Sequence, residues 1–144
     1  MPQDAIAIAS DHAGFDVKDE VGKLLAELGH EVVDLGVNGP ESVDYPDFAD
    51  AMASAISDGR AVRGILVCGT GIGISIAANR HRHIRAARCC DATDARLSRQ
   101  HNDANVLVLG SRTSGWETAR DCVLAFLNTV FEGGRHQRRI DKMS

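Results

Sequence analysis

Five short apolar runs, separated by segments whose apolar residues recur at helical spacing, constrain the fold of this chain more than any other feature. The runs suit buried strands and lie at residues 5–9, 31–35, 64–68, 84–89 and 105–109. Helical patterns follow them at residues 17–28, 46–57, 74–79, 91–100 and 116–131. Because strands that alternate with helices form parallel sheets, the order predicts a doubly wound, Rossmann-like α/β fold: one five-stranded parallel sheet with helices on both faces.

The size and charge of the chain limit its class. A length of 144 residues fits a single domain, and we expect the basic tail at 133–144 to contribute to a site or a subunit interface. A formal net charge of -4 argues against a general nucleic-acid or anionic-membrane surface. The uncharged stretch 64–79 is shorter than the roughly 20 residues of a membrane span. Four cysteines without disulfide or metal spacing suit a reducing compartment, so we expect a soluble cytoplasmic protein.

The stretch 64–79, GILVCGTGIGISIAAN, reads as a strand, a tight turn and a helix. Three glycines in five positions follow Cys68 and let the backbone approach a ligand closely, while the helix start favours anions. A helix start also favours the thiolate form of a cysteine, which makes Cys68 a candidate base or nucleophile. Taken alone, Cys68 also fits a small buried hydrophobic residue.

Other polar residues follow the same edge of the expected sheet. Asp11, His12 and Arg112 come just after strands, so in a parallel sheet they can converge with Cys68 on one crevice. Each also has a structural interpretation, because Asp11 can cap the first helix and His12 can be a solvated turn residue. His101, with Asn102, is expected just past a helix end, where a histidine can simply complement the helix dipole.

The basic residues near the chain end suit a phosphate. They form the densest basic group of an acidic protein, and guanidinium groups match phosphate geometry, although solvated surface charge is their usual role. With Arg112, the group comprises Arg135, Arg138, Arg139 and Lys142. The remaining histidines have no convincing metal spacing and are taken as surface residues: His30, His81, His83 and His136.

Several catalytic motifs are absent from the sequence. The glycines after Cys68 fall as GxGxG after the third strand, whereas a dinucleotide site needs GxGxxG after the first. The chain has no GxxxxGK[ST] motif, and Leu66 stands where a nucleophile elbow needs glycine. Ile74 stands where a loop-type phosphatase needs arginine. The remaining groups suit proton transfer on a phosphorylated small molecule without a cofactor or a metal.

Four motifs in this order resemble the RpiB/LacAB sugar-phosphate isomerase family over nearly the whole chain. They are SDHAGF at 10–15, CGTGIGISIAANR at 68–80, LSRQHNDANVLVLGSR at 97–112 and EGGRHQRRI at 132–140. The resemblance implies reversible isomerisation of ribose 5-phosphate and ribulose 5-phosphate, a step of the pentose phosphate pathway, without metal or nucleotide.

The resemblance also implies a role for each matching residue. Cys68 would move the proton between C1 and C2, and His101 would open the furanose ring with help from Asp11. The backbone of the turn, with Asn102, would stabilise the enediolate, and the turn comprises Gly69, Thr70, Gly71, Ile72 and Gly73. Substrate binding, chiefly of the phosphate, would fall to His12, Arg112, Arg135 and Arg139, with Tyr45 as a pocket residue.

The family builds its site between two subunits, so the resemblance implies a homodimer or homotetramer. His101 or the tail arginines would then serve the Cys68 of a neighbouring chain. Three alternatives stay open at this point: a hexose 6-phosphate substrate (allose or galactose 6-phosphate), a non-catalytic sugar-phosphate sensor, and a redox sensor that uses Cys68 or the Cys89-Cys90 pair.

Overall fold

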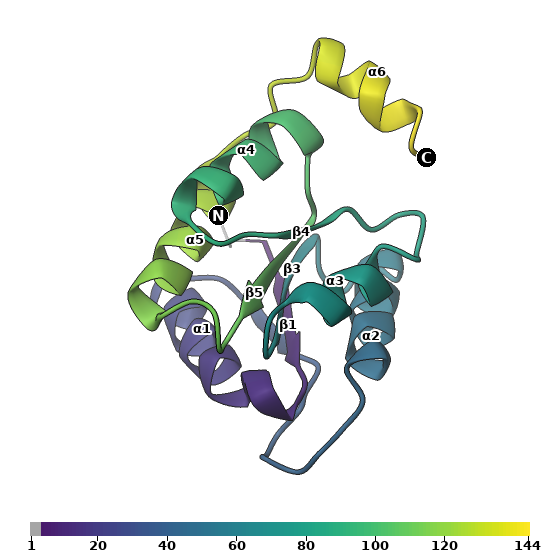
Figure 1. Cartoon of the computed structure of the whole chain (residues 1–144). Helices are drawn as coiled ribbons and strands as arrows, with labels where there is room; N and C mark the ends of the chain where they lie inside the picture. The colour runs from purple at the N-terminus through teal and green to yellow at the C-terminus, as the bar shows by residue number, and fades with distance from the viewer. Residues whose placement is uncertain (1–3) are drawn as a thin grey trace.

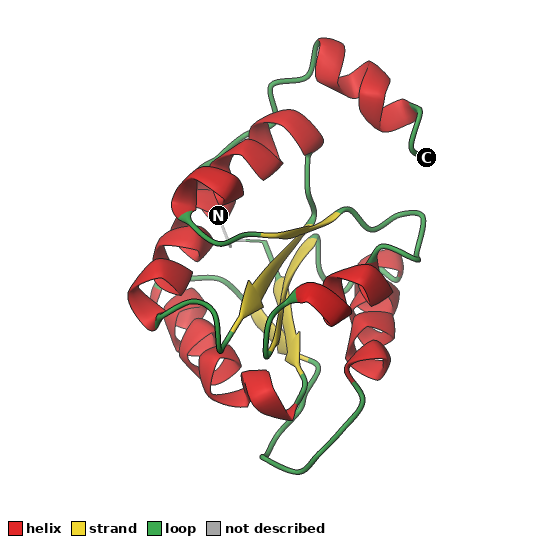
Figure 2. Ribbon diagram, in the orientation of Figure 1, coloured by secondary structure: helices red, strands yellow, loops and turns green. Residues whose placement is uncertain are grey.

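The computed structural model describes residues 4–144 and contains one parallel sheet of five strands. The strands, drawn in yellow in Figure 2, lie side by side in the order β2-β1-β3-β5-β4. Their bounds are β1 Ile6–Ser10, β2 Val32–Asp34, β3 Arg63–Cys68, β4 Ala86–Arg88 and β5 Val106–Gly110. Every strand pair is parallel, so all five carboxyl ends lie at one edge of the sheet.

Helices cover both faces of the sheet (Figure 1). The bounds are α1 Phe15–Glu27, α2 Tyr45–Ser57, α3 Ile72–Ala78, α4 Ala92–Asn102, α5 Trp116–Asn128 and α6 Arg135–Asp141, with a 3-10 turn at His12–Gly14 before α1. Buried residues of α1, α4 and α5 share one core cluster, whereas those of α2 and α3 share another on the opposite face. The doubly wound fold predicted from the sequence is therefore confirmed.

The alternation of side chains along the strands explains the two core clusters. Ile6 and Ile8 of β1 face α1 and α5, while Ala7 and Ala9 face α2. All of β1, β3 and β5 is enclosed between helices, so their sequences are nearly continuous apolar runs rather than alternating ones.

Most predicted bounds differ from the observed ones by one to three residues, and the ends of α4 and α5 are two examples. Helix α5 ends at Asn128 rather than 131, where the backbone at Thr129 becomes extended. Helix α4 continues to Asn102, so His101 lies in its last turn and not beyond it. Arg99 stabilises this extra turn, because its guanidinium donates to the Asp103 carboxylate and to the Ala104 carbonyl.

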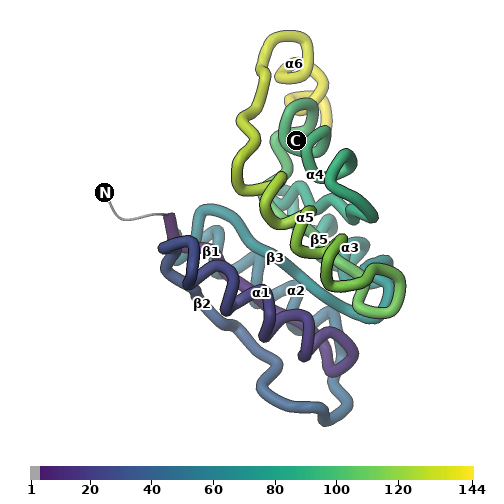
Figure 3. Tube along the Cα trace, turned by 90° about the vertical axis from the view of Figure 1, so that its left-hand side faces the viewer, coloured from purple at the N-terminus to yellow at the C-terminus, as the bar shows by residue number. Residues whose placement is uncertain are grey.

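The basic tail forms helix α6, which projects from the body beyond α4 (Figures 1 and 3). Only two side chains of α6 are buried, those of His136 and Ile140. The link to the rest of the molecule includes a hydrogen bond from the Glu132 N–H group to the Gln100 carbonyl. Within residues 4–144, no helix has the length and apolar character that crossing a membrane requires.

Candidate active site

Cys68 ends β3 at the carboxyl edge of the sheet, and its sulfur accepts a hydrogen bond of 3.1 Å from the Gly71 N–H group. Gly71 has φ = 78°, a left-handed conformation that disfavours other residues and that leads the chain from the turn into α3. Cys68 is 5% exposed, so its side chain is largely buried, and its sulfur also lies beside a hydrogen-bond donor at the carboxyl edge of the sheet.

Tyr45, at the start of α2, covers the same turn. A Cβ atom on Gly73 would lie 2.6 Å from Tyr45 Cζ, so the tyrosine ring packs directly on the backbone of residue 73. The structure therefore places the sequence-predicted pocket tyrosine beside the glycine turn, from a segment 28 positions earlier in the chain.

Asp11 and His12 reach the site from the end of β1. The Asp11 carboxylate accepts a 3.1 Å hydrogen bond from the Gly14 N–H group, so Asp11 does cap the turn at His12–Gly14. His12 Nδ1 accepts a 3.1 Å hydrogen bond from the Val43 N–H group. This bond leaves the proton of the neutral imidazole on Nε2, which makes Nε2 a donor.

Arg112 extends over the glycine turn from the end of β5. The backbone N–H group of Arg112 donates to the Gly69 carbonyl at 2.8 Å. A Cβ atom on Gly69 would lie 3.4 Å from the Arg112 guanidinium. The groups enclose a cavity of about 410 Å³ lined by Asp11, His12, Ala13, Tyr45, Cys68, Gly69, Thr70, Ile72, Gly73 and Arg112. One thiol (Cys68), one carboxylate (Asp11), one guanidinium (Arg112) and one imidazole (His12) thus line a space of small-ligand size.

The other predicted site residues do not line this cavity. His101 and Asn102 end α4, which leads into the amino end of β5, whereas Cys68 pairs with Gly110 at the carboxyl end of β5. The length of β5, about 13 Å, therefore separates the two groups within one chain. Arg135 and Arg139 lie on α6, beside α4, and are exposed.

His136 is not the surface residue that the sequence interpretation assumed. Its ring stacks on His101, with ring centres 4.5 Å apart and planes 15° apart, and only 6% of the residue is exposed. Burial, with Arg135 and His101 nearby, lowers the pKa of His136 below its usual value. The sequence interpretation missed the contact between His136 and His101. The one available signal was that Glu132 stands four positions before His136, a spacing at which a carboxylate and an imidazole can face each other.

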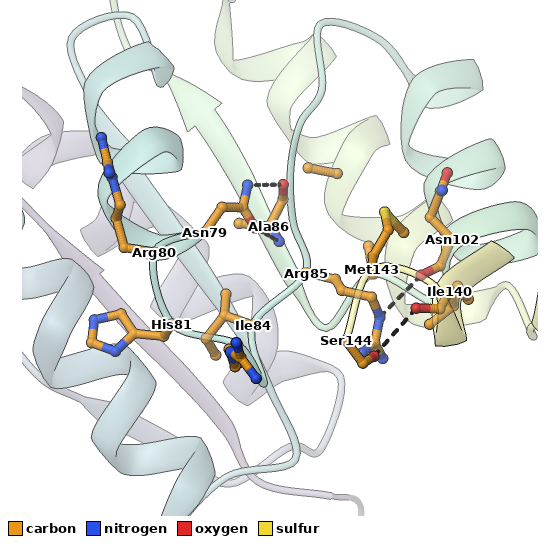
Figure 4. Close-up of a pocket in the computed structure, with 13 residues that line it drawn as sticks. Asn79, Arg80, His81, Ile84, Arg85, Ala86, Asn102, Ile140, Met143 and Ser144 are labelled. Carbon is orange, nitrogen blue, oxygen red and sulfur yellow. Dashed lines mark hydrogen bonds between the residues drawn. The ribbon is translucent and has the colours of Figure 1, made fainter.

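A second hollow of about 500 Å³ lies between the segment after α3 and the end of the chain (Figure 4). Arg85 in its wall donates to the Asn102 carbonyl at 3.1 Å, and Asn79 bonds both backbone groups of Ala86. The lining includes several arginines but no thiol and no acidic side chain. The lining also includes His81 and Asn102, whereas the thiol of Cys68 and the carboxylate of Asp11 line the other cavity.

The other cysteines are structurally separate from the site. All four cysteines are free, and burial raises the pKa of Cys89 to about 12 and that of Cys122 to about 11. Cys90 is exposed. A redox pair of Cys89 and Cys90 would thus join an unreactive thiol to an exposed one.

Comparison with known proteins identifies the family. The model of the Ribose/Galactose Isomerase family matches residues 6–143. The chain belongs to this family. This confirms the family predicted from the four sequence motifs, and with it the expectation that the chain is an isomerase.

Members of the ribose/galactose isomerase family resemble the chain over its whole length. Ribose-5-phosphate isomerase B of Escherichia coli is 49% identical over 96% of this chain and 93% of its own. A crystal structure of a ribose 5-phosphate isomerase from Thermotoga maritima is 53% identical, with a TM-score of 0.96 over 98% of this chain and 97% of that one. Ribose-5-phosphate isomerase B from Mycoplasma genitalium, solved with bound ribulose-5-phosphate, is 44% identical. Its TM-score is 0.92, over 96% of this chain and 93% of that one.

Proposed function

We propose that this isomerase interconverts D-ribose 5-phosphate and D-ribulose 5-phosphate by proton transfer through an enediolate, without a cofactor. The observation that carries the proposal is the Cys68 sulfur, which ends β3 in the cavity and accepts the Gly71 N–H group. The names of the E. coli and T. maritima relatives, at 49% and 53% identity, support the pentose phosphate as substrate.

Cys68 acts as the base in the proposed reaction. Its thiolate removes the proton from C2 of the open-chain aldose, the electron pair of that C–H bond forms the C1–C2 double bond, and the π pair of the C1 carbonyl moves onto O1. The proton of the C2 hydroxyl then passes to O1, the C2–O double bond forms, and the electron pair of the C1–C2 double bond takes the proton back from the thiol at C1. Negative charge on the enediolate oxygens lies beside the backbone of the turn, of which Gly69, Thr70, Ile72 and Gly73 line the same cavity. A positioned base of this kind contributes a factor of about 10² to 10⁴ to the rate.

Asp11, His12 and Arg112 hold the substrate in this cavity. Arg112 offers a guanidinium above the glycine turn, and His12 offers the N–H group of Nε2 because Nδ1 already accepts from Val43. Asp11 is fixed by the Gly14 N–H group, which leaves its carboxylate in place to assist ring opening. Anchoring by these groups keeps C1 and C2 within reach of Cys68.

A second copy of the chain completes the site in this proposal. His101 and Asn102 lie about one strand length from Cys68, and Arg135 and Arg139 lie on α6, outside the Cys68 cavity, so in this proposal a second chain brings such groups to the sulfur. Helix α6 projects from the body and carries the two arginines one helical turn apart, where a neighbouring subunit can receive them. A homodimer with two shared sites, or a tetramer built from such dimers, follows. The four free cysteines suit a reducing compartment, and we place the enzyme in the cytoplasm.

An isomerisation assay tests the proposal. The purified protein is incubated with ribose 5-phosphate in excess chelator, and ribulose 5-phosphate is measured, with allose 6-phosphate and galactose 6-phosphate in parallel. We expect turnover of the pentose phosphate. Turnover of a hexose phosphate alone would change the substrate, and binding without turnover of any sugar phosphate would favour a sensor.

A further inference from the structure

Three potential metal ligands meet where α4 contacts the start of α6. His101 Nε2 and His136 Nε2 lie 3.9 Å and 3.6 Å from one carboxylate oxygen of Glu132. The three ligand atoms all lie within 4.8 Å of one another. His101 comes from the last turn of α4, Glu132 from the segment that leads into α6 and His136 from the first turn of α6, so the packing of the tail on α4 brings them together.

The Nε2 atom of His136 lies in this cluster without a hydrogen-bond partner among the described residues. The residue is more than nine-tenths buried. A buried polar nitrogen in a native structure normally has a partner, so an unpaired one calls for an additional group.

We propose that His101, Glu132 and His136 bind one divalent transition-metal ion of the zinc class, and that the bound ion inhibits the enzyme by occupying His101. Two imidazoles and one carboxylate are an established zinc ligand set, with a fourth position open to water or substrate. Ligand atoms at ordinary zinc bond lengths are separated by about 3.4 Å, so small side-chain movements suffice. Ions that prefer oxygen ligands, such as Mg²⁺ and Ca²⁺, do not match the two nitrogens.

Charge around the cluster tunes the affinity. The Glu132 carboxylate supplies one negative charge, while Arg135 and Arg139 on the same segment act on His136 with positive charge. The arginines oppose a cation, which suits a reversible inhibitor better than a permanently bound structural ion. The inhibitory half of the proposal rests on the proposed function, because it requires His101 to be the ring-opening acid.

Titration of the protein with Co²⁺ tests the site directly, without reference to activity. Chelator-treated protein should develop the visible absorption of Co²⁺ held by nitrogen and oxygen ligands, and Zn²⁺ should displace it. Glu132→Gln changes a half-exposed side chain and should weaken Co²⁺ binding by at least about tenfold. His136→Phe keeps an aromatic ring against His101 and should do the same.

A matched control uses another histidine near a carboxylate. His81 Nε2 lies 2.8 Å from Asp50, and His81→Asn should leave Co²⁺ binding unchanged. Absence of the Co²⁺ spectrum in the wild-type protein, or an unchanged affinity in Glu132→Gln, would overturn the site. A strong near-ultraviolet band from Co²⁺ bound to thiolate would also overturn it, because the ion would then be on a cysteine.

Isomerase activity tests the inhibitory half. Zn²⁺ should inhibit ribose 5-phosphate turnover over the concentrations at which it displaces Co²⁺, and chelator should restore the rate. Glu132→Gln, compared with its own metal-free rate, should need at least about tenfold more Zn²⁺. Binding without inhibition would overturn the role of the ion. An inactive wild-type protein that still binds Co²⁺ would contradict the proposed function and leave the metal site supported.

Discussion

The Gly71 N–H group donates to the Cys68 sulfur across 3.1 Å, and the residue that donates is held at φ = 78°. The left-handed conformation leads the chain after residue 71 into α3, while the N–H group of the same residue stays on the sulfur at the end of β3. The bond therefore fixes the position of the Cys68 sulfur beside the cavity.

Gly71→Ala should reduce both stability and turnover. A side chain at φ = 78° costs roughly 1–2 kcal/mol of unfolding free energy, and its Cβ atom would also lie 3.2 Å from the Leu109 backbone. Urea denaturation and kcat measure the two effects. Gly39→Ala is the control, because a Cβ atom there meets nothing within 4 Å. A Gly71→Ala enzyme with wild-type kcat would show that turnover does not require glycine at the left-handed position of the turn.

Mixed dimers test whether the site is shared between subunits. Cys68→Ala and His101→Asn should each be inactive alone. In a random mixture, half of the dimers carry one subunit of each kind, and each such dimer has one intact site, so activity should recover to about a quarter of wild type. The measurement is kcat of the co-expressed chains against each variant alone. No recovery in a mixture that does form mixed dimers would place Cys68 and His101 of the same chain in one site.

Arg139→Ala should weaken substrate binding without affecting the fold. Loss of one charged contact to phosphate should raise KM for ribose 5-phosphate by about tenfold to a hundredfold. Arg139 is exposed, so thermal unfolding should not change. Arg138→Ala, an exposed neighbour on the same helix, is the control. Equal KM values for the Arg139→Ala and wild-type enzymes would exclude Arg139 from the phosphate site.

The buried thiols predict a loss of stability at alkaline pH. Burial raises the pKa of Cys89 to about 12 and of Cys122 to about 11, above the ordinary value of 9.0. Above pH 9 the unfolded chain loses these protons while the folded protein keeps them, so the unfolding free energy should fall as pH rises from 9 toward 12. Urea denaturation across this range measures the slope, and Cys89→Ala should flatten it, whereas Cys90→Ser should not.

Alkylation of the folded protein provides a second test of the same burial. Cys90 should react with iodoacetamide at pH 8, and Cys89 and Cys122 should react only after unfolding, as followed by mass spectrometry. Equal reactivity of Cys89 and Cys90, or a disulfide between them after peroxide treatment, would instead support the redox alternative.

The sequence could predict the sheet because its central strands are buried on both faces. Strands such as β3 carry an unbroken apolar run, which local pattern reveals directly. The cap at Asp11 was also predictable from the sequence, and its side chain does accept the N–H group three positions later. The end of α4 could not be predicted in this way, because it depends on hydrogen bonds from the Arg99 side chain to Asp103 and Ala104.

The candidate site was predictable only where residues follow strand ends. Asp11, Cys68 and Arg112 each do so, and a parallel sheet brings such positions to one edge. The burial of His136 against His101 depends instead on how α6 packs on α4, which no local pattern encodes. Whether His101 serves its own chain or a neighbour likewise depends on assembly and not on sequence spacing.

The rate of ribulose 5-phosphate formation by Cys68→Ala tests the central claim most directly. The account predicts that turnover falls by about 10² to 10⁴, the contribution of a positioned base, while calorimetry still detects binding of ribose 5-phosphate. Cys90→Ala, which removes an exposed thiol outside the cavity, should keep the wild-type rate. A Cys68→Ala enzyme that isomerises ribose 5-phosphate at the wild-type rate would contradict the assignment of Cys68 as the base.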